Sequence, residues 1–312
     1  MGLLAAAAVA AAVALADDIL PESGPLRPQT MKRLLVADGA RVGNRMVAVG
    51  DHGYILASED GGVSWRRAKS PRAPLLTSLQ FIDGQHGWAV GHDAMILATA
   101  DGGETWRMQF SAPKEQRPLL SVLFLDEKRG MAVGAYGAFY ETSDGGAQWA
   151  ARKVIDDDKH LNAIVSTGKG RLLIVGESGT ILRSNDAGAT WQPVASPYKG
   201  SFFGAVVARD DSIVAFGLRG HIFRSTDGGG TWTAVKTKTE AALAAATVLP
   251  DGAIAVVGNA GTLLVSRDNG QSFAAVPTGR RQSLARALPS KADSVLVLGE
   301  GGATEVSLRP AQ

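Results

Sequence analysis

A short phrase occurs seven times in this chain at nearly constant spacing. It consists of an apolar residue, Gly, two variable residues, a small residue and an apolar run ending in Ser or Thr; the first copy reads VGDHGYILAS. The copies begin at Val49, Val90, Val133, Val175, Phe216, Val257 and Leu298. Their glycines are 41, 43, 42, 41, 41 and 41 residues apart. Since a period of this length, rich in strand residues and turn glycines, is typical of β-propellers, we expect an all-β, seven-bladed β-propeller.

A second element follows six of the copies and matches the Asp-box pattern, S/T-x-D-x-G-x-x-W/F, as in Ser58 to Trp65. The carboxylate and the hydroxyl can accept backbone N–H bonds within a tight loop. The glycine permits a left-handed backbone, and the aromatic ring can pack between sheets. We therefore assign structural roles to Asp60, Asp101, Asp144, Asp186, Asp227 and Asp268.

Each repeat predicts a blade of four short strands bounded by Gly and Asp. In the second copy these strands are expected at residues 75–82, 87–91, 95–99 and 105–110. No Asp box follows the third strand of the seventh copy. We expect the N-terminal segment, at Asp18 to Leu20, to supply the outer strand of blade seven, because an unpaired edge invites aggregation.

Composition and the N-terminus limit the class of protein. The 32 Lys and Arg nearly balance the 30 Asp and Glu, which argues against a nucleic-acid partner. Cysteine is absent, which excludes disulfides and thiolate metal sites. The apolar run Leu3 to Ala16 ends in Ala-Leu-Ala before Asp17, as at a secretory cleavage site. We expect residues 1–16 to be a signal peptide, with an uncleaved anchor as the alternative, and residues 17–312 to form one propeller domain.

The combined pattern VGxxGxIxxSxDGGxxW, repeated from about Leu34 to Leu308, resembles the photosystem II assembly and stability factor family. The resemblance implies a seven-bladed propeller exported to the thylakoid lumen or the periplasm. It also implies a monomeric, non-enzymatic assembly chaperone whose partner is an integral membrane protein or complex. Relatives in non-photosynthetic bacteria accompany inner-membrane transporters, so the identity of the partner stays open.

An Asp-box hydrolase, similar to the sialidases and acting on glycans, is the alternative function. Such enzymes need an arginine triad, a Tyr–Glu nucleophile pair and an acid. The chain has 4 tyrosines and no Arg-Ile-Pro segment ahead of its boxes. We accordingly expect no catalytic residue, metal or cofactor.

Two sets of residues are candidates for partner binding. The turn between the second and third strands varies from blade to blade, and the seven turns should form a ring opposite the Asp boxes. Such turns also tolerate polar residues for no functional reason. The candidate residues of this ring are Asp51, His52, His92, Asp93, Tyr136, Glu177, Arg219, Asn259 and Glu300.

The second set is Arg183 and Arg224, which occupy the position just before the box Ser, where the resemblance suggests an arginine cluster. Glu141 holds the same position one blade earlier, so an interblade ion pair between Glu141 and Arg183 is the alternative to partner binding.

Two clusters of potential ligands raise the question of a metal-binding site. Asp51, His52, His92 and Asp93 lie at matching turns of adjacent blades, and imidazole with carboxylate can bind a divalent ion. Two solvated turns without fixed geometry are the simpler interpretation, and we favour it. The run Asp156 to Asp158 is expected to be a solvated loop rather than a calcium or partner contact.

Overall fold

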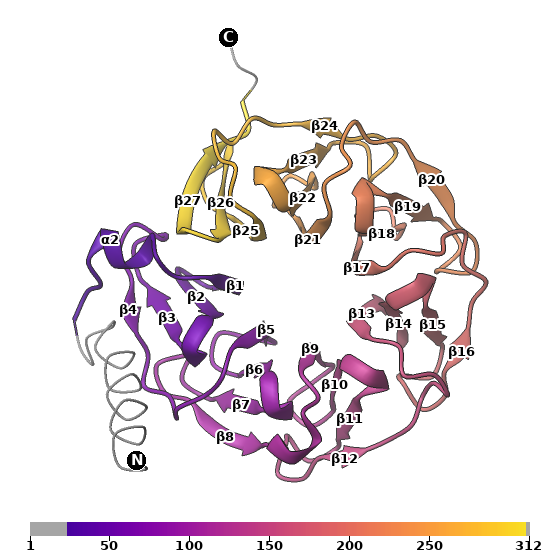
Figure 1. The fold of residues 1–312 in the computed structure, drawn as a ribbon, viewed down its shortest axis with the longest axis horizontal. Helices are drawn as coiled ribbons and strands as arrows, with labels where there is room; N and C mark the ends of the chain where they lie inside the picture. The colour runs from indigo at the N-terminus through magenta and orange to yellow at the C-terminus, as the bar shows by residue number, and fades with distance from the viewer. Residues whose placement is uncertain (1–23, 310–312) are drawn as a thin grey trace, which may run out of the picture.

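Seven antiparallel sheets stand around a central axis in the computed structural model, which describes residues 24–309. In Figure 1 the first strand of each sheet lies next to the axis and the last lies at the rim. The seven-bladed propeller is therefore confirmed. No helix within residues 24–309 is long and apolar enough to cross a membrane.

Six blades have four strands in the order of the chain, and the strand bounds follow the repeat. Blades one to three comprise β1 (Val36–Val42), β2 (Arg45–Gly50), β3 (Ile55–Ser58), β4 (Arg66–Arg67); β5 (Leu76–Phe81), β6 (Gly87–Gly91), β7 (Ile96–Thr99), β8 (Arg107–Phe110); β9 (Leu119–Phe124), β10 (Gly130–Gly134), β11 (Phe139–Thr142), β12 (Ala150–Ala151). Blades four to six comprise β13 (Leu161–Gly168), β14 (Arg171–Gly176), β15 (Ile181–Ser184), β16 (Gln192–Pro193); β17 (Phe202–Val207), β18 (Ile213–Gly217), β19 (Ile222–Ser225), β20 (Thr233–Val235); β21 (Leu243–Val248), β22 (Ile254–Gly258), β23 (Leu263–Ser266), β24 (Ala274–Ala275). The strands expected for the second copy match β5 to β8 within two residues at each end.

Blade seven has three strands among the described residues: β25 (Leu284–Pro289), β26 (Ser294–Gly299) and β27 (Gly302–Ser307). The described end of the N-terminal segment pairs with blade one, because the Leu26 N–H donates to the Trp65 carbonyl (2.6 Å) and Pro25 bridges Arg66. Leu26 also packs with Leu296 in the layer between blades seven and one. Asp18 to Leu20 lie outside the described residues, so their strand stays a prediction.

The only α-helix within residues 24–309, α2 (Pro28–Met31), covers the same seam (Figure 1). A short 3₁₀ turn lies between the second and third strands in six blades, and a further one lies in the link after blade two. The turns are η1 (Asp51–Gly53), η2 (His92–Ala94), η3 (Pro113–Glu115), η4 (Ala135–Gly137), η5 (Glu177–Gly179), η6 (Leu218–Gly220) and η7 (Asn259–Gly261).

The hydrophobic core lies in layers between neighbouring blades. The second strands are almost entirely buried, and β6 is buried along its whole length, because a blade covers each of their faces. In six layers a box aromatic packs against the preceding blade; Trp106, for example, packs with Val47 and Val49 of blade one. In the layer between blades six and seven, Val306 and Leu308 are buried without a box aromatic in the described cluster.

Strand direction alternates within a blade, so each kind of loop gathers on one face. The Asp-box loops and the first hairpins lie together on one face, which we call the box face. The seven turns and the links between blades lie on the other, which we call the turn face. The expected ring of turns opposite the boxes therefore follows from the topology.

Candidate functional surfaces

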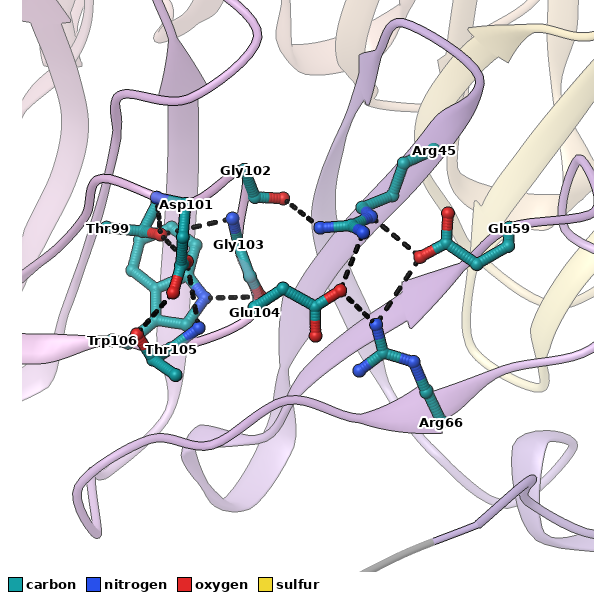
Figure 2. A network of polar contacts seen from close by, with 10 residues as sticks. All are labelled: Arg45, Glu59, Arg66, Thr99, Asp101, Gly102, Gly103, Glu104, Thr105 and Trp106. Carbon is teal, nitrogen blue, oxygen red and sulfur yellow. Dashed lines mark hydrogen bonds and ion pairs between the residues drawn. The ribbon is translucent and has the colours of Figure 1, made fainter.

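Each Asp-box carboxylate closes its own loop. Asp101 Oδ1 accepts hydrogen bonds from Thr99 Oγ1 (2.7 Å) and the Thr105 N–H (3.0 Å), and its Oδ2 accepts one from Thr105 Oγ1 (2.5 Å). Thr99 Oγ1 in turn accepts the Gly103 N–H (3.1 Å), and Trp106 Nε1 donates to the Gly103 carbonyl (3.1 Å; Figure 2). The carboxylate is used within the loop, which suits a structural role.

These hydrogen bonds lower the pKa of the box carboxyls. The Thr190 hydroxyl and N–H lower the pKa of Asp186 from 3.8 to about 2. The Ser64 hydroxyl and N–H do the same for the pKa of Asp60, also to about 2. The folded protein therefore stabilises the ionised form of these carboxyl groups.

The Asp-box loop of blade two is also joined to blade one by an ion-pair network (Figure 2). Arg45 contacts Glu59 (2.7 Å) and Glu104 (2.6 Å), and its Nη1 donates to the Gly102 carbonyl (3.0 Å). Arg66 contacts the same two carboxylates at 3.3 and 2.6 Å. Both arginines and both glutamates are paired within the network. It therefore connects the two blades and leaves none of these four charges unpaired for a ligand.

The two arginine candidates reach toward the next blade. Arg224 pairs with Asp210 (2.6 Å) and donates from Nε to the Asn269 carbonyl (2.8 Å) in the box loop of blade six. A Cβ built on Gly230 would lie 3.2 Å from Arg183 Nη1, which places Arg183 beside the box loop of blade five. Their role in partner binding stays a prediction.

The alternative prediction, an ion pair between Glu141 and Arg183, is wrong. Glu141 pairs with Arg152 (3.3 Å), which follows the last strand of the same blade. Arg152 also donates to the Ala189 carbonyl (3.2 Å), so it is Arg152 that crosses to blade four. A link residue that no sequence pattern indicated therefore makes the interblade contact.

The turn candidates have a common backbone. The second turn residue is left-handed at His52, Asp93, Tyr136 and Arg219, with φ of 53° to 59°. The first residue is fixed by a hydrogen bond to the segment before the first strand, as from the Asp51 N–H to the Leu35 carbonyl (2.9 Å). The exposed members of the ring are His52, His92, Tyr136, Arg219, Asn259 and Glu300. Asp51, Asp93 and Glu177 are half-buried.

The turns of blades one and two do not assemble a metal site. His52 contacts only the Asp51 carboxylate of its own turn (3.5 Å) among the ion pairs of residues 24–309. Over the same residues, one group of three potential ligands has its ligand atoms within 4.8 Å of one another. It consists of Asp83, His86 and Glu127 on the box face and is largely exposed. In the acidic run, Asp156 pairs with Lys153 (3.0 Å) and Asp157 with Lys159 (2.7 Å), as expected for a solvated loop.

A central cavity of about 490 Å³ lies along the axis, lined by the first strands. Asp38 is the one acidic residue in its lining, and Arg286 of blade seven pairs with it (3.3 Å). Asp38 also accepts the N–H groups of Gly39 (2.8 Å) and Leu79 (2.9 Å), so it joins blades seven, one and two. Sequence reasoning missed this group, because nothing local distinguishes Asp38 from a surface residue.

Other side chains of the cavity wall join neighbouring first strands. Thr77 Oγ1 donates to the Leu119 carbonyl (2.6 Å), and Asn162 Nδ2 donates to the Phe202 carbonyl (2.7 Å). Both donors lie where the strand register shifts by one residue, and such a bulge re-aims a side chain. These side chains of the cavity wall therefore join neighbouring blades by hydrogen bonds.

The fold and these loops define a seven-bladed propeller with an Asp-box loop in six of its blades. The model of the family described as photosynthesis system II assembly factor YCF48 matches residues 64–118 and 108–254. Because these matches span more than half of the chain, the protein belongs to this family. No curated protein matches the chain.

Solved structures share the fold. One described as YCF48 bound to D1 peptide is 20% identical, with a TM-score of 0.70 over 89% of this chain and 93% of that one. YCF48 from Cyanidioschyzon merolae is 17% identical, with a TM-score of 0.68 over 88% and 96%. The GH74 xyloglucanase from Xanthomonas campestris is 14% identical, with a TM-score of 0.66 over 89% of this chain but 52% of that one. At these identities the likeness concerns the fold alone.

Proposed function

We propose that this protein is an exported, non-enzymatic propeller that binds a segment of a membrane-protein partner during its assembly. The observation that carries the proposal is membership of the assembly-factor family, together with the structural relative that holds a D1 peptide. In that relative a propeller of the same fold binds a peptide, which shows what this architecture can do. A photosystem II subunit and a subunit of an inner-membrane transporter are the two partners that the proposal allows.

The surfaces of the molecule support binding more than catalysis. Most glycoside hydrolases use two carboxyl groups that flank the scissile bond, and sialidases use a tyrosine nucleophile. The central cavity offers Asp38, whose oxygens accept two backbone N–H groups and face Arg286. The Asp-box carboxylates, in contrast, accept hydrogen bonds within their own loops, as at Asp101. These engagements leave the cavity with a structural carboxylate rather than an acid–nucleophile pair.

The turn face is the surface that we propose for binding. Its turns differ chemically between blades while their backbones are alike, so side chains can vary there without cost to the fold. Tyr136 is 51% exposed on this face, and its ring contacts His160 edge-on at 5.0 Å. A large, rigid aromatic group at the surface is typical of a contact residue.

Site-specific crosslinking tests the proposal. A photoreactive amino acid is placed at Tyr136 or Asn259 on the turn face, and at Val63, which is 84% exposed on the box face, as the matched control. We expect one discrete adduct with a membrane protein from the turn-face positions and little from Val63. Equal adducts from all three positions would contradict the assignment of the face, and the absence of any adduct would contradict the function.

Export is tested separately. Residues 1–16 lie outside the described residues, and the proposal for them rests on the apolar run ending in Ala-Leu-Ala. The mature protein, recovered from a fractionated native cell, should begin at Asp17 and appear in the periplasm or the thylakoid lumen. An intact N-terminus in the cytosol would refute this part of the proposal.

A further inference from the structure

We propose that the outer edge of blade seven binds an extended, apolar segment of a partner protein as a fourth strand. The edge belongs to β27, and an apolar groove beside it separates blade seven from blade six. Both lie at the rim of the ring, apart from the turn face (Figure 1). The inference therefore goes beyond the proposed function and does not depend on it.

Blade seven presents the longest strand edge at the rim of the described ring. Its sheet has three strands within residues 24–309, and over that range no strand pairs with the outer side of β27. β27 has six residues, whereas the outermost strands of the other blades have two to four. Unpaired N–H and C=O groups along such an edge are a template for a further strand.

Blade seven also lacks the aromatic ring that closes the other layers. Within residues 24–309, six of the seven layers contain a box aromatic, and Trp232, for example, packs against blade four. After Ser307 the chain has Arg309 and Ala311 where a box has Asp and Gly. Ser307 is exposed, whereas the six box Ser and Thr residues are buried, and Val306 takes the buried position instead.

A groove of about 520 Å³ lies in the layer that has no box aromatic. Val276 of blade six and Leu308 line it and belong to the apolar cluster of that layer. Val276 corresponds to Val194 of blade four, since each donates its N–H to the third strand of its own blade (2.9 Å). Val194 packs in the cluster that contains Trp232. The groove is therefore placed where other layers hold a large aromatic side chain.

The charged side chains around the groove already have partners. The ion pairs, each with a closest N–O distance of 3.0 Å, are Glu305–Lys291, Arg309–Asp293 and Arg267–Asp251. The remaining acidic group of the lining, Asp268, accepts hydrogen bonds within its own box loop. Since these charges are matched and the walls are apolar, the complementary ligand is an uncharged strand with a large apolar side chain.

The described start of the chain leads away from this edge. Leu26 bonds to the Trp65 carbonyl, and the segment before α2 runs along β4 of blade one, away from β27 (Figure 1). Residues 1–23 and 310–312 contain no aromatic residue. A segment of another protein is therefore the occupant that we propose, and the strand expected at Asp18 to Leu20 is the competitor that the test has to exclude.

The probe for the test is a fluorescent peptide with the sequence of residues 231–235, TWTAV. In blade five these uncharged residues supply both the box aromatic, Trp232, and the outer strand β20. We expect the peptide to bind the purified protein, and the same peptide with Ala for Trp to bind about tenfold more weakly. Hydrogen exchange of the β27 amides should slow in the complex, because the added strand pairs with them.

Two matched variants locate the binding site. Ala274→Trp adds a ring at the wall of the groove, since Ala274 is exposed and pairs with Val265. Ala150→Trp is the control, because Ala150 is exposed at the same position of blade three, where the next layer already holds Trp191. We expect Ala274→Trp to weaken peptide binding about tenfold and Ala150→Trp to change it less than about twofold. Both variants should keep the circular dichroism spectrum of the wild type.

The same variants test the native partner. A photoreactive amino acid at Ser307, which is exposed on β27, should form a discrete adduct with another protein in the native cell. Ala274→Trp should abolish this adduct and Ala150→Trp should not. An adduct that survives Ala274→Trp, or the absence of any adduct, would contradict the proposal.

Other outcomes would also overturn it. If the peptide fails to bind, or binds both variants equally, the groove is not the site. Peptide binding that appears only after deletion of residues 17–23 would show that this segment covers the edge, as the sequence predicts. Dimerisation of the wild type that Ala274→Trp abolishes would assign the edge to a second copy of the chain. None of these results bears on the crosslinks from Tyr136 and Asn259, which test the proposed function separately.

Discussion

At the scale of the residue, one carboxylate in each Asp box accepts several hydrogen bonds from its own loop. Asp227 accepts the N–H groups of Gly230 (3.0 Å) and Thr231 (2.9 Å) together with the hydroxyls of Ser225 (2.8 Å) and Thr231 (2.8 Å). The backbone N–H of Thr231 is the largest cause of the lowered pKa of Asp227, which falls to about 2. The ionised carboxylate of Asp227 thereby closes the loop, and the hydrogen bonds of the loop in turn stabilise its negative charge.

Replacing Asp101 by Ala should therefore destabilise the protein by about 1–3 kcal/mol, since the Thr105 N–H loses its acceptor. Asp101→Asn, which keeps an acceptor oxygen without the charge, should cost less. Urea unfolding followed by tryptophan fluorescence measures both changes. If Asp101→Ala unfolded at the wild-type urea concentration, the structural role would be refuted.

Acid should weaken the fold through the same groups. A carboxyl whose pKa is lower in the folded than in the unfolded chain stabilises the fold above the unfolded value and loses that contribution as the pH falls through the folded value. For Asp60, Asp186 and Asp227 these limits are 3.8 and about 2. The melting temperature should be steady from neutral pH to about 4 and fall steeply from there to about 2, and less steeply in Asp186→Asn. A melting temperature independent of pH over that interval would exclude this linkage.

Arg224 and Arg219, five residues apart, should differ in how much their substitution by Gln changes stability. Arg224→Gln removes the contacts to Asp210 and the Asn269 carbonyl and should cost about 1–3 kcal/mol. Arg219→Gln, in the exposed turn, should change stability by less than about 0.5 kcal/mol. Thermal unfolding of the two variants decides between them, and a neutral Arg224→Gln would return that arginine to the list of free binding residues.

At the scale of the element, the repeat glycine exists because of a close approach rather than an unusual backbone. Gly91 is extended, with φ of −172°. A Cβ at this position would lie 2.2 Å from the Leu75 carbonyl, which accepts the N–H of His92 (3.0 Å). The same approach recurs before every turn; at Gly134, for example, the Pro118 carbonyl would be 2.1 Å away. The turn is thereby locked to the link that precedes its blade.

Gly91→Ala should accordingly destabilise the fold by about 2–3 kcal/mol, because the backbone must move to admit the methyl group. The matched control is Gly84→Ala, where a Cβ would have no atom within 4 Å. Its effect should stay within about 0.5 kcal/mol. Calorimetry of the purified variants provides the comparison, and equal melting temperatures would show that the turn can relax.

At the scale of the whole molecule, the ring is closed where blade seven meets blade one. Leu26, Trp65 and Leu296 share the apolar layer of this seam, and the Arg286–Asp38 pair spans it beside the central cavity. The closing contacts thus come from both ends of the chain. They form only when the seven blades are all in place.

Arg286→Met should lower the free energy of unfolding by about 1–3 kcal/mol, because it leaves the Asp38 carboxylate without its cation. Asp38→Ala should cost more, since it also removes the acceptor of the Leu79 N–H. In the double variant the two costs should not add, because the pair is a single interaction. Strict additivity in urea unfolding would mean that the two residues do not act together at the seam.

The number of blades, their strands and the closure of the Asp-box loops could be predicted from the amino-acid sequence. This information is local: the glycine repeat recurs every 41 to 43 residues, and Asp101 bonds within four residues of itself. The class of fold and the ring of turns therefore followed from spacing and strand direction alone.

The contacts between side chains of different blades could not be predicted in this way and emerge from the three-dimensional arrangement of the blades. Glu141 contacts Arg152 rather than Arg183, and Asp38 joins residues from three blades. Thr77 likewise donates to the Leu119 carbonyl of the next blade, 42 residues along the chain. Such contacts depend on how neighbouring sheets are stacked and on which face each loop reaches. A pattern within one repeat carries no record of that geometry, because the partners of each side chain belong to a different repeat.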